Sequence, residues 1–380
     1  MTEQPLRIIH CFRSPVGGIF RHVRDLVNYH YEQGHKIGIL CDSSTGGEHE
    51  DKLFETILPK LELGLQRIEI GRAVTPKDFI AARKVFKEIK SLQPDILHGH
   101  GAKGGAYVRL MGSLLRGSRS RVTRFYSPHG GTLHYDSSSL QGKAYFAVER
   151  FLERWTDGLI FVSDHERRTY FEKIGTPKTD WDLVYNGLTE QDFKPIRNKK
   201  DAVDFLYIGM MRDLKGPDVF IDALRVAERI TGRPLHAHMV GDGPDKENYQ
   251  LKIHKMGLGE RIKMHPAMMA RDAFALARNV VIPSRAEAMP YIVLETVAAK
   301  KPIICTNVGG IPEIMGEDCA SMVAPGDADI LGAVMAKAAD EKRWLASCLP
   351  DREAFTKRFS VQTMADNLME IYQKAGKKAA

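Results

Sequence analysis

The stretch that decides the fold is NVVIPSRAEAMPYIVLETVAAKKPIICTN, which runs from Asn279 to Asn307. It begins and ends with short apolar runs rich in β-branched residues, which are typical of buried strands. The segment between them has the composition of a helix that begins at Pro290, because proline is favoured where its missing N–H would have no partner. The stretch therefore predicts strand, helix and strand, the unit from which parallel sheets are built.

Two carboxylates flank the start of this helix. Glu287 lies in the loop before it, and Glu295 lies about one and a half turns inside it at ~1.5 Å rise per residue, so each can reach a different end of an elongated ligand. A capping box between Ser284 and Glu287 is the alternative, but it places Pro290 inside the helix at a cost of roughly 3 kcal/mol. Glu295 could also be a solvated acid, although its mostly apolar neighbours indicate burial and a need for a partner.

Length and composition indicate a globular protein of two domains. The chain has 380 residues, of which 43% are apolar and 27% charged. Its five cysteines show no C-x-x-C spacing, which favours free thiols in a reducing cytoplasm. No apolar run approaches the roughly 18 residues of a membrane span and no signal peptide is evident, so we expect a cytoplasmic protein, at most peripheral on the inner membrane face.

A net charge of +7 favours an anionic partner. Part of the excess lies in a basic segment over residues 109–124 and part in the C-terminal tail QKAGKKAA. Such runs are usually solvated faces, and peripheral contact with an anionic membrane is the functional alternative. Nucleic acid is not expected as a partner, because the arginines are not interleaved with aromatic residues. The arginines of the basic segment are Arg109, Arg116, Arg119, Arg121 and Arg124.

Strand-like and helix-like patterns alternate along the chain, which predicts an α/β fold of doubly wound parallel sheets. We expect an N-terminal domain over residues 1–190, a polar linker over 191–203 and a second domain over 204–358. A C-terminal helix over 359–380 can pack back on the first domain. Ligands of such sheets bind beyond the carboxyl ends of the strands, so the loops that follow the strands are candidate sites.

Those loops contain glycines and cations. A glycine before a helix N-terminus lets the backbone approach a phosphate closely, and Arg212 and Lys215 add positive charge beside one such loop. The pattern predicts a diphosphate site. Each glycine would also suit a tight turn in any wound sheet, and His129 alone would be an ordinary loop histidine. The glycines in question are Gly17, Gly18, Gly209 and Gly241.

Together these motifs resemble the retaining glycosyltransferases of family four, which have the GT-B fold of two facing Rossmann-like domains with a central cleft. The resemblance spans nearly the whole chain and is strongest from about Tyr207 to Met315. The matched motifs are Glu-x7-Glu at Glu287 and Glu295, GxxxxxKG at Gly209 to Gly216, Gly-Gly at Gly17 and Gly18, HG at His129 and Gly130, and GGIPEI at Gly309 to Ile314.

Two positions depart from the family pattern. Many members carry arginine directly after the glycine of the GxxxxxKG loop, whereas Met210 stands here and Arg212 follows two residues later. Members also tend to have glycine before the KP that follows the Glu-x7-Glu helix, where this chain has Lys300. A left-handed C-cap at Lys300 would be mildly strained.

The resemblance implies a retaining, metal-independent glycosyltransferase of hexosyltransferase type with no cofactor. Its donor would be a UDP- or GDP-linked sugar held by the C-terminal domain, and its acceptor a hydroxyl of a glycan or lipid-linked molecule, as in cell-surface polysaccharide or lipopolysaccharide biosynthesis. It assigns Glu295 to the ribose and Glu287 to the sugar. The implied catalytic residues are His129, Arg212, Lys215 and Glu287, and the implied donor-binding residues are Gly17, Gly18, Gly209, Gly241, Tyr291, Ile292 and Glu295.

Other functions are weighed against this one. The segment GHGAKG at residues 99–104 is a literal G-x-G-x-x-G, the motif of an NAD(P)-dependent oxidoreductase. However, it follows the fourth predicted strand and not the first, and Arg124 lies about 20 residues later, where such an enzyme has an acid. A nucleotide-sugar epimerase of similar fold stays open. A phosphorylase is disfavoured because no motif resembles its cofactor site.

A metal site is not expected. His98 and His100 have no carboxylate or cysteine cluster nearby at ligand spacing. Of the Asp-x-Asp pairs Asp180/Asp182 and Asp327/Asp329, which would suit a metal-dependent transferase of another fold, the second is better explained by Asp327 as a helix N-cap.

Overall fold

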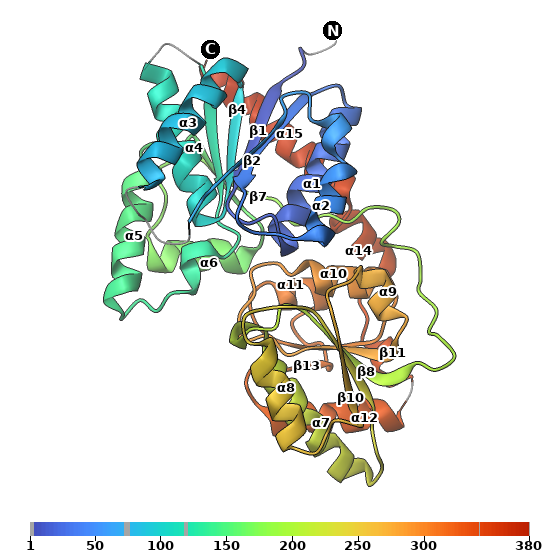
Figure 1. Ribbon diagram of the computed structural model, residues 1–380. Coiled ribbons are helices and arrows are strands. Elements are labelled where there is room, and N and C mark those ends of the chain that lie inside the picture. The colour runs from blue at the N-terminus through green and yellow to red at the C-terminus, as the bar shows by residue number, and fades with distance from the viewer. Residues whose placement is uncertain (1–3, 72–76, 118–120, 342, 380) are drawn as a thin grey trace. The chain divides into compact units, whose positions relative to one another are not determined.

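The computed structural model describes residues 4–71, 77–117, 121–341 and 343–379, and these form two compact units (Figure 1). Unit 1 comprises Met1–Gly187 and Val361–Ala380, and unit 2 comprises Leu188–Ser360. Arg119 of the basic segment and Ala380 of the tail lie outside the described residues. Each unit is an α/β layer structure around a parallel sheet, which confirms the predicted fold class.

Unit 1 is built on a sheet with the strand order β3-β2-β1-β4-β5-β6-β7. The order reverses between β1 and β4, which pair directly with His10 opposite His98. Ligands of doubly wound sheets bind at such a reversal, beyond the carboxyl ends of the strands. The strands are β1 Arg7–Phe12, β2 Lys36–Asp42, β3 Leu65–Ile68, β4 Ile96–His100, β5 Thr123–Ser127, β6 Gly158–Phe161 and β7 Trp181–Leu183.

The C-terminal helix α15 completes the core of unit 1, although it is remote in sequence. Tyr29 on α1 donates to Asp366 at 2.9 Å, and the fully buried Tyr372 lies 2.6 Å from Nδ1 of His98. The helices are α1 Gly17–Glu32, α2 Glu48–Glu55, α3 Lys77–Leu92, α4 Gly101–Gly117, α5 Leu140–Glu153, α6 Asp164–Lys173 and α15 Val361–Ala379, with 3-10 turns η1 Leu58–Lys60 and η2 Gly131–His134.

Three arginines of the basic segment donate hydrogen bonds to carboxylates of unit 1. Arg109 is fully buried and donates to Glu149 at 2.8 Å. Arg116 and Arg124 both donate to Asp157 at 2.9 Å. These three arginines therefore pair with two carboxylates within the unit. Among the described residues, no helix combines the length and apolar character needed to cross a membrane.

Unit 2 has the strand order β10-β9-β8-β11-β12-β13, again with every pair parallel. Its order reverses between β8 and β11. Strand β11 ends just before Pro283, which has no N–H to donate to a neighbouring strand. The strands are β8 Val203–Ile208, β9 Ala237–Val240, β10 Ile262–His265, β11 Ala277–Ile282, β12 Ile303–Thr306 and β13 Met322–Val323.

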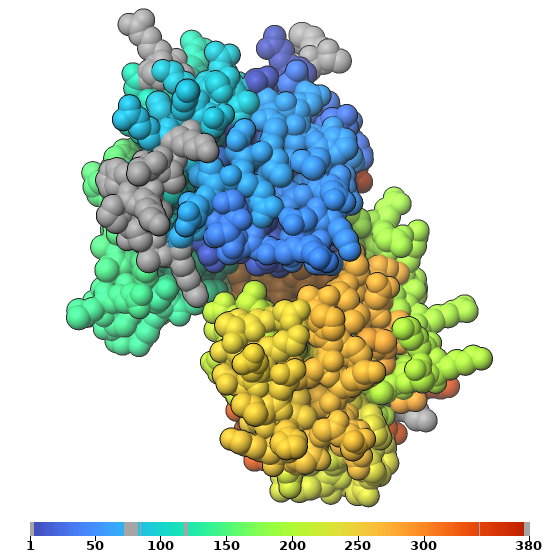
Figure 2. All heavy atoms as spheres, in the orientation of Figure 1, coloured from blue at the N-terminus to red at the C-terminus, as the bar shows by residue number. Residues whose placement is uncertain are grey.

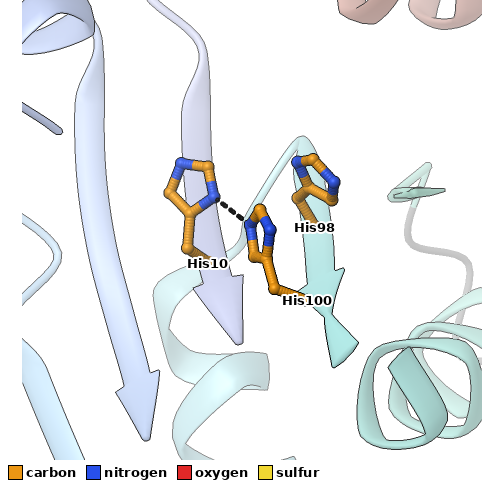
Figure 3. Close-up of side chains that lie close together, drawn as sticks. All are labelled: His10, His98 and His100. Atoms are coloured by element: carbon orange, nitrogen blue, oxygen red, sulfur yellow. Dashed lines mark hydrogen bonds between the residues drawn. The ribbon is translucent and has the colours of Figure 1, made fainter. Parts of the chain in front are cut away.

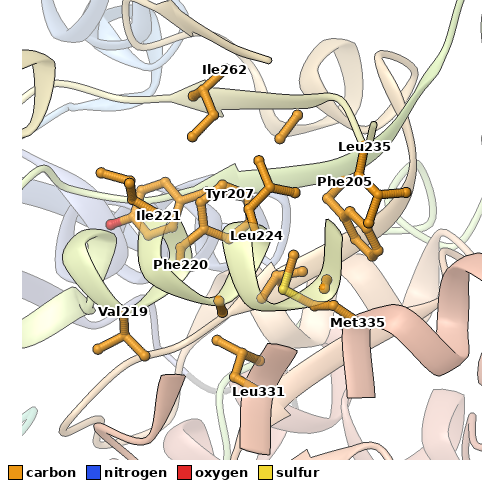
Figure 4. Close-up of a cluster of buried hydrophobic side chains, with 14 of the residues drawn as sticks. Phe205, Tyr207, Val219, Phe220, Ile221, Leu224, Leu235, Ile262, Leu331 and Met335 are labelled. Carbon is orange, nitrogen blue, oxygen red and sulfur yellow. The ribbon is translucent and has the colours of Figure 1, made fainter. Parts of the chain in front are cut away.

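The core of unit 2 joins β8 to the helix pair α7 and α12, with Phe205 and Tyr207 of the strand facing apolar side chains of both helices (Figure 4). Asp327 caps α12 by accepting from the amides of Asp329 and Ile330, which confirms its predicted role. The helices are α7 Pro217–Thr231, α8 Lys246–Lys255, α9 Ala270–Phe274, α10 Tyr291–Ala298, α11 Ile311–Met315, α12 Ala328–Asp340, α13 Trp344–Ser347 and α14 Arg352–Arg358, with the 3-10 turn η3 Asp213–Lys215.

Candidate active site

Two loops of unit 2 meet at the point where its strand order reverses. One follows β8 and ends with Lys215 in η3, and the other follows β11 and contains Glu287. Nζ of Lys215 lies 2.6 Å from Oε1 of Glu287. Two predicted site residues that are remote in sequence are therefore in direct contact, where ligands of doubly wound sheets bind.

Glu287 is a buried carboxylate with two donors. It is 8% exposed, and Oε1 also accepts from the hydroxyl of Ser284 at 2.7 Å. The Lys215 side chain is 29% exposed, so a ligand can reach its ammonium group. The Ser284 contact joins two side chains ahead of the helix, so it does not cap the helix start. Sequence reasoning considered Ser284 only as a helix cap and missed this contact.

Glycines allow these loops to touch. Gly216 has a left-handed φ of 66°, and a Cβ there would lie 2.1 Å from the carbonyl oxygen of Pro283. Gly309 has φ 62°, and a Cβ there would lie 2.0 Å from the carbonyl oxygen of Glu287. No side chain fits at either distance. The glycines of the GxxxxxKG and GGIPEI motifs thus hold the Lys215 and Glu287 loops against their neighbours.

The predicted glycines Gly209 and Gly241 are also brought together. A Cβ on Gly241 would lie 2.0 Å from the carbonyl oxygen of Gly209, and the amide of Gly209 donates to Val240. Arg212 follows on the same loop, is partly exposed and makes no ion pair with the residues that the structure describes. Its charge is available to a ligand beside Lys215.

The N-cap of helix α10 makes no side-chain hydrogen bond. It begins at Tyr291, because Pro290 is extended at φ −76° and ψ 117° and forms the N-cap, so the sequence prediction placed the start one residue early. No side chain caps this end, and the first turn holds no acidic residue. The amides near Tyr291 and Ile292 therefore favour an anion, and Glu295 lies partly exposed in the next turn. The strain expected at Lys300 is confirmed by its φ of 56°.

Arg285 is a further structural member of the site that sequence reasoning missed. Its guanidinium donates to the carbonyl oxygen of Asp213 and to both carboxylate oxygens of Asp218. This hydrogen bonding raises the pKa of Arg285. Arg285 thus ties the loop after β11 to η3 and to the start of α7, which helps to fix the position of Lys215. This role is visible only in the fold, which brings together two loops that are remote in the sequence.

In unit 1 the other predicted residues follow β1 and β5. Gly17 and Gly18 are exposed at the start of α1, whose N-cap Val16 offers no side-chain bond, and Gly17 has φ 67°. His129 is partly exposed and has a left-handed φ of 50°, which is unusual for a residue other than glycine. The buried carboxylate of Glu166, which sequence reasoning missed, accepts from the amide of Gly130 and anchors this turn.

His129 is connected to a row of histidines. Its Nε2 lies 3.0 Å from Nδ1 of His100, whose Nε2 lies 3.0 Å from Nδ1 of His10. Figure 3 shows the second of these contacts between β1 and β4. Burial lowers the pKa of His10, His100 and His129 well below the usual value, so these imidazoles are neutral near pH 7.

Comparison with known proteins agrees with this geometry. Residues 16–191 match the family model described as Glycosyltransferase Family 4, and residues 189–358 match the model described as Glycosyl transferases group 1. The chain is a glycosyltransferase. Its two matched domains correspond to the GT-B fold, and the second contains the contact between Lys215 and Glu287.

This glycosyltransferase is similar to several curated proteins and solved structures. It is 29% identical over 307 residues to the putative teichuronic acid biosynthesis glycosyltransferase TuaC of Bacillus subtilis, covering 77% of this chain and 74% of that one. It is 23% identical over 317 residues to the UDP-Gal:α-D-GlcNAc-diphosphoundecaprenol α-1,3-galactosyltransferase of Escherichia coli, covering 78% and 79%. The structure of Anabaena HepE in complex with UDP-glucose shares the fold, with TM-score 0.77, 16% identity and 97% and 100% coverage.

Proposed function

We propose that the enzyme is a retaining, metal-independent glycosyltransferase that moves a hexose from a UDP- or GDP-sugar to a hydroxyl of a glycan or lipid-linked acceptor. The contact between Lys215 and Glu287 carries the proposal. It supports the proposal because a cation that would suit a diphosphate lies next to a carboxylate that would suit sugar hydroxyls, and a nucleotide sugar has its groups in this order. The donor of the Escherichia coli relative and the ligand of the Anabaena structure favour uracil as the base.

The proposed chemistry develops negative charge on the leaving phosphate. The bond between the anomeric carbon and the phosphate oxygen breaks while the acceptor oxygen bonds to the same face of that carbon. The acceptor proton passes to the leaving phosphate oxygen. Lys215, Arg212 and the positive end of the α10 dipole stabilise the charge as it forms, and such preorganised stabilisation is usually the largest catalytic contribution.

The remaining residues are assigned to different parts of the donor. Glu295 accepts hydrogen bonds from the ribose hydroxyls and Glu287 from the sugar hydroxyls. Gly209 and Gly241 let the backbone approach the donor without a side chain. In unit 1, His129 contacts the transferred sugar through the ring nitrogen that His100 does not occupy. The left-handed turn at His129 supports this role, because strained backbone is retained where it positions a functional group.

A nucleotide-sugar epimerase is the second candidate, because it would use the same diphosphate and sugar contacts. The two activities differ in their need for an acceptor. A transferase releases nucleoside diphosphate in step with formation of a glycoside, whereas an epimerase converts the sugar without one.

The test begins with a thermal-shift screen of UDP- and GDP-sugars, since a bound donor raises the apparent melting temperature by mass action. Transfer from the stabilising donor is then measured in excess EDTA, with glycan and lipid-linked acceptors. We expect full activity in EDTA and a product with the anomeric configuration of the donor, assigned by NMR. Loss of activity that manganese or magnesium restores would contradict metal independence, and an inverted product would contradict retention.

We further propose that α5 carries the peripheral contact with an anionic membrane. Its outer face exposes Leu140 by 86%, Val148 by 52% and Phe151 by 46%. In the space-filling view, atoms in the green of the α5 region lie at one edge of unit 1 (Figure 2). Lys143 and Arg154 are exposed at this face, and the Arg154 guanidinium lies 4.3 Å from the Phe151 ring centroid. Apolar and basic side chains on one helix face suit an anionic lipid surface.

Sedimentation with vesicles tests this surface. We expect binding to vesicles that contain phosphatidylglycerol and little binding to phosphatidylcholine alone. The double variant Leu140→Ser/Phe151→Ser should bind at least about tenfold more weakly, because each large side chain contributes roughly 1.5–3 kcal/mol when buried. The matched control Ile230→Ser/Leu251→Ser alters equally exposed side chains of unit 2, at 58% and 56%, and should bind like the parent. Equal binding by all three proteins would contradict the assignment to α5.

A further inference from the structure

Three histidines of unit 1, His22, His100 and His129, form a compact group that we call the outer trio. One ring nitrogen of each lies within 4.8 Å of the other two, and those of His100 and His129 are 3.0 Å apart. Zinc bound by three imidazoles at 2.0–2.1 Å holds its ligand nitrogens about 3.3 Å apart in a tetrahedral site. The nitrogens of the trio therefore lie near ligand spacing.

Two members of the outer trio have a partner on the opposite ring nitrogen. Nδ1 of His22 lies 3.1 Å from the amide oxygen of Asn186, so this nitrogen carries the proton and Nε2 has a lone pair. Nε2 of His100 lies 3.0 Å from Nδ1 of His10. When Nε2 of His100 carries the proton it can donate to Nδ1 of His10, and Nδ1 of His100 then has a lone pair. Metal-ligating histidines characteristically use their second nitrogen in this way, because it fixes the ring and its tautomer.

A second group, His10, His98 and His100, is less suitable and is called the inner trio. Its members extend from β1 and β4 toward one another (Figure 3). Both ring nitrogens of His98 are already engaged, with Tyr372 at 2.6 Å and Ser127 at 2.8 Å, and all three rings are at most 1% exposed. The outer trio instead includes the partly exposed His129, which gives a cation a route from the surface.

We propose that the outer trio binds one transition-metal cation of the zinc class through Nε2 of His22, Nδ1 of His100 and Nε2 of His129. Three neutral imidazoles and an open fourth position form a donor set that suits zinc, cobalt or nickel. Local sequence spacing does not reveal the trio, because its members lie on α1, β4 and the loop after β5.

Bound to Nε2, the cation would inhibit sugar transfer by fixing the His129 ring and by adding positive charge next to the ring nitrogen that contacts the sugar. This consequence alone rests on the proposed function, because it requires His129 to contact the transferred sugar. Zinc should then inhibit transfer reversibly, and EDTA should restore activity without lowering the activity of the metal-free enzyme.

Cobalt titration of the metal-free protein tests the site without any assay of transfer. We expect one equivalent of Co²⁺ to give the visible absorption of a tetrahedral site, and zinc to displace it. His22→Gln and His129→Asn should each weaken cobalt binding by at least about tenfold, since each removes one of three ligands. His98→Gln removes a member of the inner trio and no ligand of the outer trio, and it should bind cobalt like the parent. His238→Asn/His265→Asn removes a histidine pair of unit 2 with 2.9 Å between ring nitrogens, and it should also bind cobalt like the parent. Thermal unfolding of each variant shows that it is folded.

The outcomes separate the site from its consequence. A tetrahedral cobalt band that depends on His22 and His129 but not on His98 supports the outer trio. Absence of the band from the folded parent, or its loss only in His98→Gln, overturns the proposal. If cobalt binds as expected but zinc leaves transfer unchanged, the metal site stands and the role of His129 in transfer is wrong.

Discussion

Replacing Lys215 with alanine is expected to lower the turnover number of sugar transfer by about 100-fold or more, which corresponds to ~2.7 kcal/mol of lost transition-state stabilisation. The ammonium group sits beside a buried carboxylate at the point where the strand order reverses, and it remains reachable by a ligand. A charge held in place before the reaction needs no reorganisation when the leaving phosphate becomes more negative. Steady-state kinetics with the identified donor measures the effect.

Two controls isolate the catalytic effect of Lys215. Lys252→Ala removes a lysine of unit 2 with similar exposure, which pairs with Asp222 at 2.7 Å, and it should leave turnover within about twofold of the parent. Lys215→Ala leaves Glu287 with the Ser284 hydroxyl as its one donor among the described residues, so folding must be checked. We expect circular dichroism to show both variants folded at the assay temperature. Turnover of a folded Lys215→Ala variant near that of the parent would remove Lys215 from the mechanism.

The fold was predictable because it depends on local patterns that repeat along the chain. The run NVVIPS predicted a strand, and β11 covers Ala277–Ile282, with its end set by the proline that follows. Pro290 also predicted the start of α10 closely, and the helix begins one residue later because Pro290 takes an extended conformation outside it. Alternation of strands and helices then leaves few architectures besides parallel sheets wound with helices.

The candidate site was predictable as a set of residues but not as a set of contacts. Lys215 and Glu287 each stand in a strand-end loop, yet their 2.6 Å contact depends on β8 and β11 being neighbours, which no local pattern states. The same holds for Arg285, whose partner Asp218 lies 67 positions away in the sequence. The histidine groups are the clearest case, because β1 and β4 become neighbours only through the reversal of strand order.

Substituting the two glutamates of the Glu-x7-Glu pair should have different effects on nucleotide binding and on sugar transfer. Glu295 lies in the second turn of α10, whereas Glu287 lies in the loop before the helix, and Glu295 is proposed to accept from the ribose hydroxyls. Glu295→Gln keeps the shape of the side chain but loses its charge. The affinity for the bare nucleoside diphosphate should then fall by about 1.5 to 3 kcal/mol, the range for a hydrogen bond to a charged group.

Glu287→Gln should instead leave nucleoside diphosphate binding intact or slightly stronger, because the substitution frees Lys215 from its carboxylate partner before the phosphates arrive. Transfer should still fall, since the sugar loses a charged acceptor that acts beyond the nucleotide. Calorimetry with UDP and GDP on both variants, together with turnover of the full donor, measures the two effects separately. If Glu287→Gln is the variant that loses nucleoside diphosphate, or if both variants bind it as tightly as the parent, the assignment of one glutamate to each end of the donor is wrong, and the enzyme class is unaffected.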